Sequence, residues 1–137
     1  MRRTLCVFNR TRESFLGLRV APADTWRMGL KALSEKSGVT PDDGVWLISS
    51  RGVHTIGMLC AIDLIYLDSA NRVLHLVEHL GPFRISPIKS KCASILALHS
   101  QAIYSSNTRV GDELLICTPE QIKDCVDGKE TQPAFPN

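Results

Sequence analysis

Residues 45–80 read VWLISSRGVHTIGMLCAIDLIYLDSANRVLHLVEHL, and this stretch decides the fold class. It contains three apolar runs, at 45–49, 61–67 and 73–80, separated by polar or glycine-containing breaks. Runs of this length, rich in β-branched and aromatic residues, are typical of β-strands. The short polar loop at 68–72 joins the second run to the third and predicts an antiparallel hairpin.

The same reasoning extends to the rest of the chain. Further strands are predicted at 3–9, 15–21, 92–98 and 113–117. One main helix is predicted near residues 25–37, where Asp24 is a suitable N-cap and Trp26, Leu30 and Leu33 recur at helical spacing. Shorter helical turns are predicted at 100–107 and 119–126. This pattern, without βαβ alternation, predicts a mainly β fold: an antiparallel sandwich or a partly closed, jelly-roll-like barrel.

The bulk composition predicts one β-rich domain, residues 1–126, followed by a disordered tail at 127–137. The net charge of +2 is too small to imply a polyanionic partner. The charge is unevenly spread, because residues 1–36 carry eight Lys or Arg and three acids, whereas residues 111–130 carry six acids and two lysines. We therefore expect the basic and acidic ends of the domain to lie together.

The cysteines predict a reducing compartment. There are five, an odd number, and none forms a CxxC pair: Cys6, Cys60, Cys92, Cys117 and Cys125. The longest apolar runs are too short to span a bilayer. We therefore expect a cytoplasmic protein without a membrane partner. The N-terminal arginines lack accompanying aromatic residues, so no nucleic-acid partner is predicted.

Four segments resemble a known family. In chain order they are Arg27-Met28-Gly29-Leu30, Gly44-Val45-Trp46-Leu47, the VHTxGM…IDxxxLD run at 53–68, and Val110-Gly111-Asp112. Their order and spacing resemble the uncharacterised family called domain of unknown function 192. The resemblance implies a compact, mainly β, barrel-like domain and implies no activity. It also implies an acidic residue and a Pro-Ala-Gly turn near residues 96–101, where this chain reads LALHSQ. If those residues shape a family site, this chain is an altered member.

One motif suggests zinc. Residues 75–79, HLVEH, match the H-x-x-E-H pattern in which two histidines one helical turn apart bind zinc. The flanking residues predict a strand, on which His75 and His79 would share a face but stand about 13 Å apart. No single ion bridges that distance, so no metal site is predicted.

The candidate binding residues lie in segments bounded by glycine or proline: Arg51, His54, Thr55 and Arg84. Gly52 and Gly57 allow the backbone of residues 51–58 to leave strand geometry. Loops held by a rigid sheet are where binding residues concentrate. The leading hypothesis is a non-enzymatic binding or accessory module that needs no cofactor and takes a small anionic or polyhydroxylated ligand at this segment.

Asp63 supports a second hypothesis. A carboxylate inside an apolar strand must be hydrogen-bonded, so Asp63 either ties down nearby backbone amides or faces a pocket as a ligand-binding group. In the second case the protein would be a hydrolase-like enzyme for a small or carbohydrate-like substrate, using Asp63 and His54. A thiol nucleophile at Cys60 is disfavoured by the expected burial of that residue. A third hypothesis is a structural subunit that self-associates through an exposed sheet edge. The expected oligomeric state is a monomer or a weak homo-oligomer.

Overall fold

A computed structural model of the chain describes residues 4–24 and 41–127. The mainly β prediction is confirmed. The helix predicted near residues 25–37 lies outside the described residues, and so does the tail predicted at 127–137 apart from Asp127, which is helical. The elements, in chain order, are β1 (Leu5–Asn9), β2 (Ser14–Ala23), β3 (Asp43–Ile48), β4 (Ile62–Leu67), β5 (Val73–Leu80), β6 (Ser94–His99), α2 (Ala102–Ser106), β7 (Leu114–Cys117) and α3 (Pro119–Asp127).

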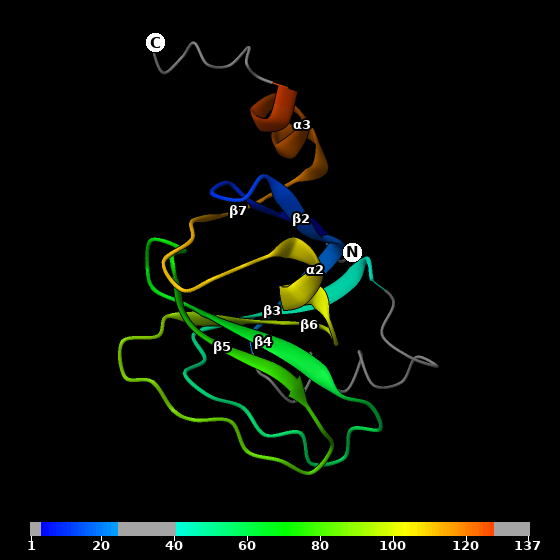
Figure 1. Cartoon of the computed structure of the whole chain (residues 1–137), viewed down its shortest axis with the longest axis vertical. Coiled ribbons are helices and arrows are strands. Elements are labelled where there is room, and N and C mark those ends of the chain that lie inside the picture. Colours follow the sequence, from blue (N-terminus) through cyan, green and yellow to red (C-terminus); the bar gives the residue numbers. More distant parts are fainter. Residues whose placement is uncertain (1–3, 25–40, 128–137) are drawn as a thin grey trace.

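All seven strands form one curled sheet, in the order β5-β4-β6-β3-β2-β1-β7 (Figure 1). The two outer strands approach each other at one end, where Arg72 and Glu113 form an isolated antiparallel bridge. Beside that bridge the Val73 amide donates to the Asp112 carbonyl at 2.8 Å, and the Gly111 amide donates to the Val73 carbonyl at 2.9 Å. The sheet is therefore a half-barrel closed at one end, which confirms the prediction of a partly closed barrel.

One strand pair differs from the antiparallel pattern. β2 and β3 run parallel, with Val20 opposite Gly44, whereas the other neighbouring strands are antiparallel. The sheet is therefore mixed. The physical reason lies in the connection, because parallel strands need a crossover of a dozen or more residues. Residues 24–42 separate β2 from β3 and are long enough for one.

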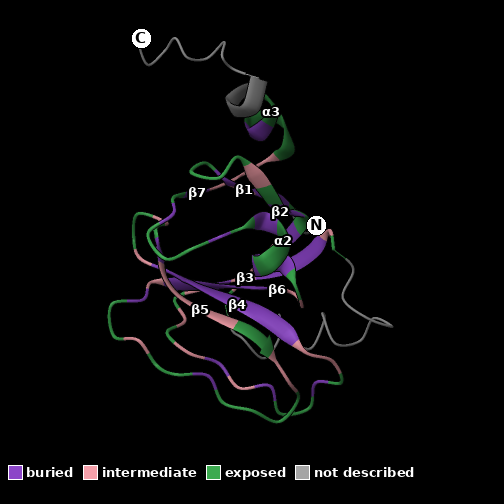
Figure 2. Cartoon of the chain, viewed as in Figure 1, coloured by how far each residue is buried: buried purple, intermediate pink, exposed green. Residues whose placement is uncertain are grey.

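The core consists of two apolar clusters on the two faces of β4. Side chains alternate along a strand, so Ile62, Leu64 and Tyr66 contribute to the first cluster, while Ile65 and Leu67 contribute to the second. β4 is buried along its whole length (Figure 2). Burial on both faces explains why its sequence is a continuous apolar run rather than an alternating one.

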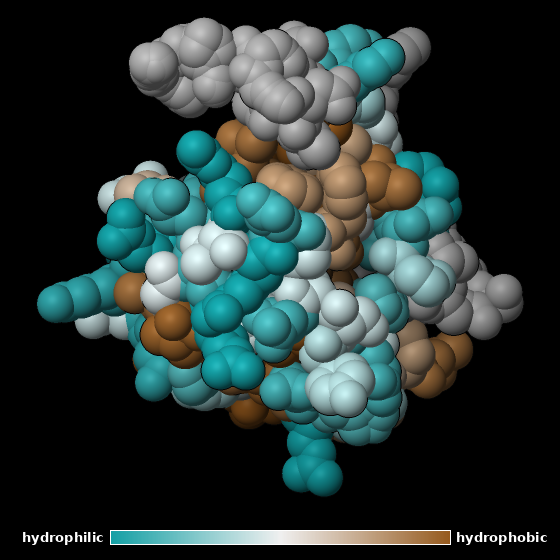
Figure 3. Space-filling view, turned by 45° about the horizontal axis from the view of Figure 1, so that its top comes forward, coloured by the Kyte–Doolittle hydropathy of each residue, from teal (hydrophilic) through white to brown (hydrophobic). Residues whose placement is uncertain are grey.

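The basic and acidic ends of the domain meet, as the charge pattern predicted. β1 pairs with β7 along four residue positions, and Arg12 Nε lies 3.1 Å from Asp112 Oδ2. Hydrophilic residues cover much of the face seen in Figure 3, and hydrophobic residues gather in its upper centre. Within the described part of the chain, no helix has the length and apolar character needed to cross a membrane.

Asp112 is the polar centre of this junction. Its Oδ2 accepts hydrogen bonds from Asn9 Nδ2 at 3.0 Å, the Arg109 amide at 2.9 Å and Arg12 Nε at 3.1 Å. Burial alone raises the pKa of the Asp112 carboxyl, but the bonds from Asn9, Arg109 and Arg12 outweigh it and lower the pKa overall. Asp112 thus stabilises the fold in its ionised form.

The description of the core predicts that a Leu→Ala substitution lowers stability much more at a buried position than at an exposed one. Leu64 is fully buried in β4, whereas Leu59 is 83% exposed. Leu64→Ala should lower the free energy of unfolding by about 2–5 kcal/mol, because it leaves a cavity. Leu59→Ala should stay within about 0.5 kcal/mol of wild type. Urea denaturation of both variants measures the difference, and equal losses would contradict this description of the core.

The lowered pKa of Asp112 predicts how stability depends on pH. A carboxyl with a folded pKa below its unfolded pKa contributes stability above the unfolded value, about 3.9. This contribution is lost as the pH falls through the folded pKa. The difference in free energy of unfolding between wild type and Asp112→Asn should therefore be constant from about pH 7 to pH 5 and shrink below about pH 4. Denaturant titrations across this range test it, and a constant difference down to pH 2 would contradict it.

Candidate functional site

Two loops at the end of the barrel opposite α3 form the candidate site (Figure 1). The first loop, residues 49–60, follows β3, and the second loop, residues 81–92, joins β5 to β6. They run antiparallel, with His54 bridged to Ile85. Backbone bonds of 2.8 Å, from the Ser86 amide to the Val53 carbonyl and from the Thr55 amide to the Arg84 carbonyl, hold them together. The loops are thus a fixed pair.

The two glycines of the first loop have different roles. Gly57 has a φ of 92°, in the left-handed region that glycine adopts without strain. Gly52 permits a close approach instead, because a Cβ there would lie 3.0 Å from both the Pro87 carbonyl oxygen and Ile88 Cγ1. The predicted departure from strand geometry therefore occurs at Gly57, and Gly52 lets the second loop pack against the first.

Tyr66 anchors the second loop to the barrel. Its hydroxyl lies 2.6 Å from Ser86 Oγ and 2.6 Å from the Pro87 carbonyl oxygen. Ser86 Oγ in turn accepts a bond from the Val53 amide at 2.8 Å. Burial, the largest influence, raises the pKa of Tyr66, so this residue remains a neutral phenol. A chain of hydrogen bonds therefore runs from β4 through the second loop to the first.

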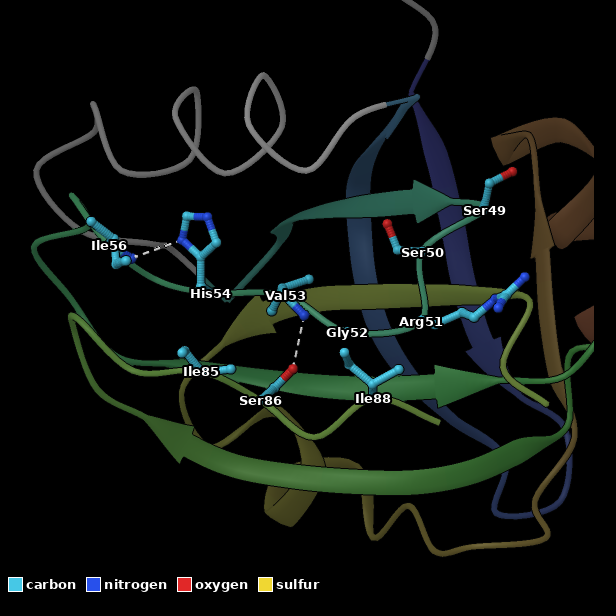
Figure 4. Close-up of a pocket in the computed structure, with 10 residues that line it drawn as sticks. All are labelled: Ser49, Ser50, Arg51, Gly52, Val53, His54, Ile56, Ile85, Ser86 and Ile88. Atoms are coloured by element: carbon cyan, nitrogen blue, oxygen red, sulfur yellow. Dashed lines mark hydrogen bonds between the residues drawn. The ribbon is translucent and has the colours of Figure 1, made fainter. Parts of the chain in front are cut away.

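A hollow of about 560 Å³ lies between the loops (Figure 4). Its apolar lining includes Val53 and three isoleucines. Arg51 and His54 stand at the two ends of segment 51–54, which forms one wall of the hollow. His54 Nδ1 accepts a bond from the Ile56 amide at 3.4 Å. The described residues that line the hollow are Ser49, Ser50, Arg51, Gly52, Val53, His54, Ile56, Ile85, Ser86 and Ile88.

Of the polar lining residues, the sequence identified Arg51 and His54 but not the serines at 49, 50 and 86, and it missed the apolar residues. Ile56, Ile85 and Ile88 are 58%, 76% and 77% exposed and stand around the hollow. Each lies among glycine, proline, serine or charged residues, which indicate a polar loop. These residues could have been identified in the sequence because large aliphatic residues recur there in segments that lack strand periodicity.

Thr55 and Arg84 lie beside the hollow rather than in its lining. Thr55 is fully buried. Its hydroxyl donates to the Gly81 carbonyl at 2.6 Å and accepts from the Arg84 amide at 2.8 Å. Both hydrogen-bonding capacities of the hydroxyl are thus used to hold the second loop in place. The Arg84 side chain is exposed to solvent.

Asp63 lies on the other face of β4. It is fully buried, and its alternation with Leu64 places it opposite the first cluster, to which Val53 of the first loop belongs. Its Oδ1 accepts from the His79 amide at 2.8 Å, and its Oδ2 accepts from the Ile103 amide at 2.9 Å. The carboxylate therefore ties β5 and α2 to β4. The structure does not bring Asp63 and His54 into one site.

The H-x-x-E-H motif lies on β5, as predicted. A register shift opposite Asp63 breaks the alternation between its two histidines. The His75 ring packs edge-on against Tyr66, with centroids 5.2 Å apart, and burial lowers the pKa of His75. His79 Nδ1 instead lies 2.7 Å from Ser100 Oγ. Within the described residues, no three His, Cys, Asp or Glu side chains are placed to hold a metal ion.

Two other predicted features are also placed. Cys60 is half-buried and packs against the first cluster. The LALHSQ segment forms the end of β6 and the residue before α2, where Gln101 has a φ of 86°. Glycine adopts this left-handed conformation readily, whereas glutamine is strained in it. This chain therefore lacks the Pro-Ala-Gly turn in sequence, but its backbone at Gln101 still has a conformation suited to glycine.

Comparisons with known proteins agree with this fold. The model of the family called domain of unknown function 192, described as "Uncharacterized ACR", matches residues 7–116. No curated protein matches the chain. A protein of unknown function from Novosphingobium aromaticivorans is similar in structure, with a TM-score of 0.68, 13% identity, and coverage of 83% of this chain and 84% of the other. A candidate transcription regulator from Sinorhizobium meliloti has a TM-score of 0.68, 16% identity, and coverage of 85% and 94%. These likenesses show the fold alone.

The placement of Asp63 generates a prediction about stability. Asp63→Asn puts an amide nitrogen against one of the two backbone donors, so that a buried hydrogen bond is lost. The free energy of unfolding should fall by roughly 1–3 kcal/mol. Amide hydrogen exchange should increase at His79 or Ile103, and stay unchanged at Val53 and Thr55 on the other face. Exchange that increases in the loops instead would contradict the assignment of Asp63 to β5 and α2.

Proposed function

Because this chain belongs to the uncharacterised family called domain of unknown function 192, whose description names no activity, we propose a function from the site itself. The protein is a binding module, and the hollow between its two loops takes a small molecule with an apolar body and an acidic head group. The observation that carries this proposal is the lining of the hollow: aliphatic side chains across its walls, with Arg51 and His54 at its polar positions.

The size and lining of the hollow support a small ligand. Its volume of about 560 Å³ falls within the roughly 300–1,000 Å³ that is common for small-molecule sites. Val53, Ile56, Ile85 and Ile88 offer an aliphatic wall against which the hydroxyls of a sugar would lose hydrogen bonds to water. Of the two ligand classes that the sequence left open, the anionic one is therefore favoured over the polyhydroxylated one.

The charge of the loops supports an acidic head group. Neither loop contains an Asp or Glu, so the positive charge of Arg51 is not offset within them. A guanidinium binds a carboxylate or phosphate through two parallel hydrogen bonds. His54 adds an imidazole to the same lining, and its Nδ1 accepts from the Ile56 amide.

Binding is better supported than hydrolysis. The hydrolase-like hypothesis pairs Asp63 with His54, but the two lie on different sides of β4 and Asp63 already accepts two backbone amides. General acid–base catalysis requires both groups within hydrogen-bonding reach of one substrate. A binding module requires only the hollow and the polar groups that line it.

Self-association through a sheet edge is less well supported. β5 forms one edge of the sheet, and its pairing with β4 contains two register shifts. Bulged and charged edges resist pairing with another chain, and Glu78 lies exposed in this strand. A monomer fits these features.

A cytoplasmic location is part of the proposal. Cys6, Cys60 and Cys92 carry free thiols. Burial, the largest influence, raises the pKa of both Cys6 and Cys92, so these thiols are protonated and unreactive at neutral pH. Free thiols on a folded domain are typical of a reducing compartment.

A thermal-shift comparison of matched probes tests the proposal. Octanoate combines an aliphatic body with a carboxylate, octanol lacks the charge, and glucose 6-phosphate lacks the apolar body. Octanoate should raise the melting temperature more than the other two. A probe at 100 times its dissociation constant stabilises the folded state by about 2.7 kcal/mol.

The site residues should be separable from the fold. Arg51→Ala with His54→Ala should abolish the octanoate shift without lowering the melting temperature of the unliganded protein appreciably, because both side chains stand at the edge of the hollow. Arg10→Ala, in the turn after β1, is the matched control and should retain the shift. A double variant that binds octanoate as wild type does would place the ligand elsewhere, and one that unfolds would make these side chains structural.

A further inference from the structure

The two loops also carry an exposed apolar surface that extends beyond the hollow. Of the nine exposed large hydrophobic side chains in the described part of the chain, five belong to these loops. Leu59 and Phe83, 83% and 66% exposed, do not line the hollow. Together with Ile56, Ile85 and Ile88 they form what we call the loop surface. Apolar groups gathered at one end of a domain mark an interaction site.

The charge of the loop surface is of one sign. The two loops contain Arg51, Arg84, Lys89 and Lys91 and no acidic residue. In the described part of the chain, none of these four cations forms an ion pair. The contrast with the body of the barrel is clear, because Arg12, Arg19 and Arg72 all have carboxylate partners within 4 Å. The loop surface is therefore complementary to an anionic partner.

The apolar side chains are held outward by the backbone. Phe83 has a φ of 58°, a left-handed conformation that is strained for a bulky residue. Its amide donates to the Thr55 carbonyl at 3.0 Å, and the Thr55 hydroxyl fastens the residues on either side of it. The strain is thus maintained by bonds that present the ring to solvent.

We propose that the loop surface docks on a lipid bilayer that contains anionic phospholipids. Leu59 and Phe83 enter the boundary between head groups and acyl chains, and Arg84, Lys89 and Lys91 face the lipid phosphates. Shallow insertion of apolar groups combined with attraction to anionic lipid is how peripheral proteins bind reversibly. This interaction goes beyond the proposed binding of a small molecule. The sequence predicted no membrane partner because it lacks a span, and surface docking requires none.

A bilayer matches the loop surface better than a folded protein does. The apolar side chains project singly from turns, between cations, and a fluid interface accommodates such projections without a complementary shape. The cytoplasmic leaflet is also the anionic one, in agreement with the proposed location.

Vesicle sedimentation tests the proposal. The whole chain is mixed with vesicles of phosphatidylcholine alone, or of phosphatidylcholine with phosphatidylserine at 30 mole per cent. It should sediment with the anionic vesicles and much less with the neutral ones, and the bound fraction should fall as salt screens the charges. Replacing Arg84 and Lys91 with Gln should weaken partition about twenty-five-fold, since each cation near the surface contributes about a five-fold preference.

The apolar contribution is tested separately. Leu59→Ser with Phe83→Ser should remove most of the binding to anionic vesicles, while the melting temperature stays within a few degrees of wild type. Matched controls lie outside the loop surface: Tyr104→Ser on α2, whose ring is 79% exposed, and Lys123→Gln on α3. Both should bind as wild type does. These substitutions leave Arg51 and His54 intact, so the octanoate shift should persist in the variants that no longer sediment.

Three results would overturn the proposal. One is sedimentation with neither kind of vesicle. Another is equal binding of wild type and all variants, which would place the contact outside the loop surface. The third is a loop-dependent dimer in light scattering, or binding to heparin without binding to vesicles, since the occupant would then be a second copy or an anionic polymer.

Discussion

The burial of β4 on both faces is the constraint on which the rest of the structure depends. The curl of the sheet covers the face of Ile65 and Leu67, and it brings Arg72 to Glu113 and closes one end. The two loops cover the other face through Val53, Met58 and Cys92. Only two polar side chains lie among the six residues of β4, one on each face. Asp63 binds the amides of β5 and α2 on one face, and Tyr66 binds the second loop on the other. The polar groups of one strand thus position both the helix and the site.

Much of the fold was predictable because strand composition is a local property. The predicted runs at 61–67 and 73–80 became β4 and β5, paired through the hairpin loop at 68–72. Pairing across distance was not predictable. β6 lies between β3 and β4 although it follows both in the chain, and β2 pairs with β3 in parallel. Which strands become neighbours depends on how both apolar clusters are buried together, and this depends on the whole chain rather than on a local segment.

The candidate site was predictable in place but not in character. Gly52 and Gly57 indicated an irregular loop, and Arg51 and His54 do line the hollow. The second loop could not be foreseen as its other wall, because the bridge from His54 to Ile85 joins residues that are 31 positions apart. Thr55 illustrates the same limit. In the sequence, nothing distinguishes the Thr55 hydroxyl from other polar groups. Its structural role arises only because the fold brings the Gly81 carbonyl and the Arg84 amide within hydrogen-bonding distance.

The cost of the loop conformation bears on its use. A left-handed backbone at Phe83 is unfavourable, and burial of the ring would offset that cost in a residue serving the core. Here the ring is 66% exposed, so the isolated protein recovers little of it. The fully used Thr55 hydroxyl shows that the barrel nevertheless holds this conformation in one arrangement. Apolar side chains that are already held in one conformation lose less conformational entropy when a partner covers them. Without a partner, these exposed side chains add little to the stability of the folded protein. In the proposed docking, burial of the Phe83 ring in the bilayer offsets the cost of its left-handed backbone.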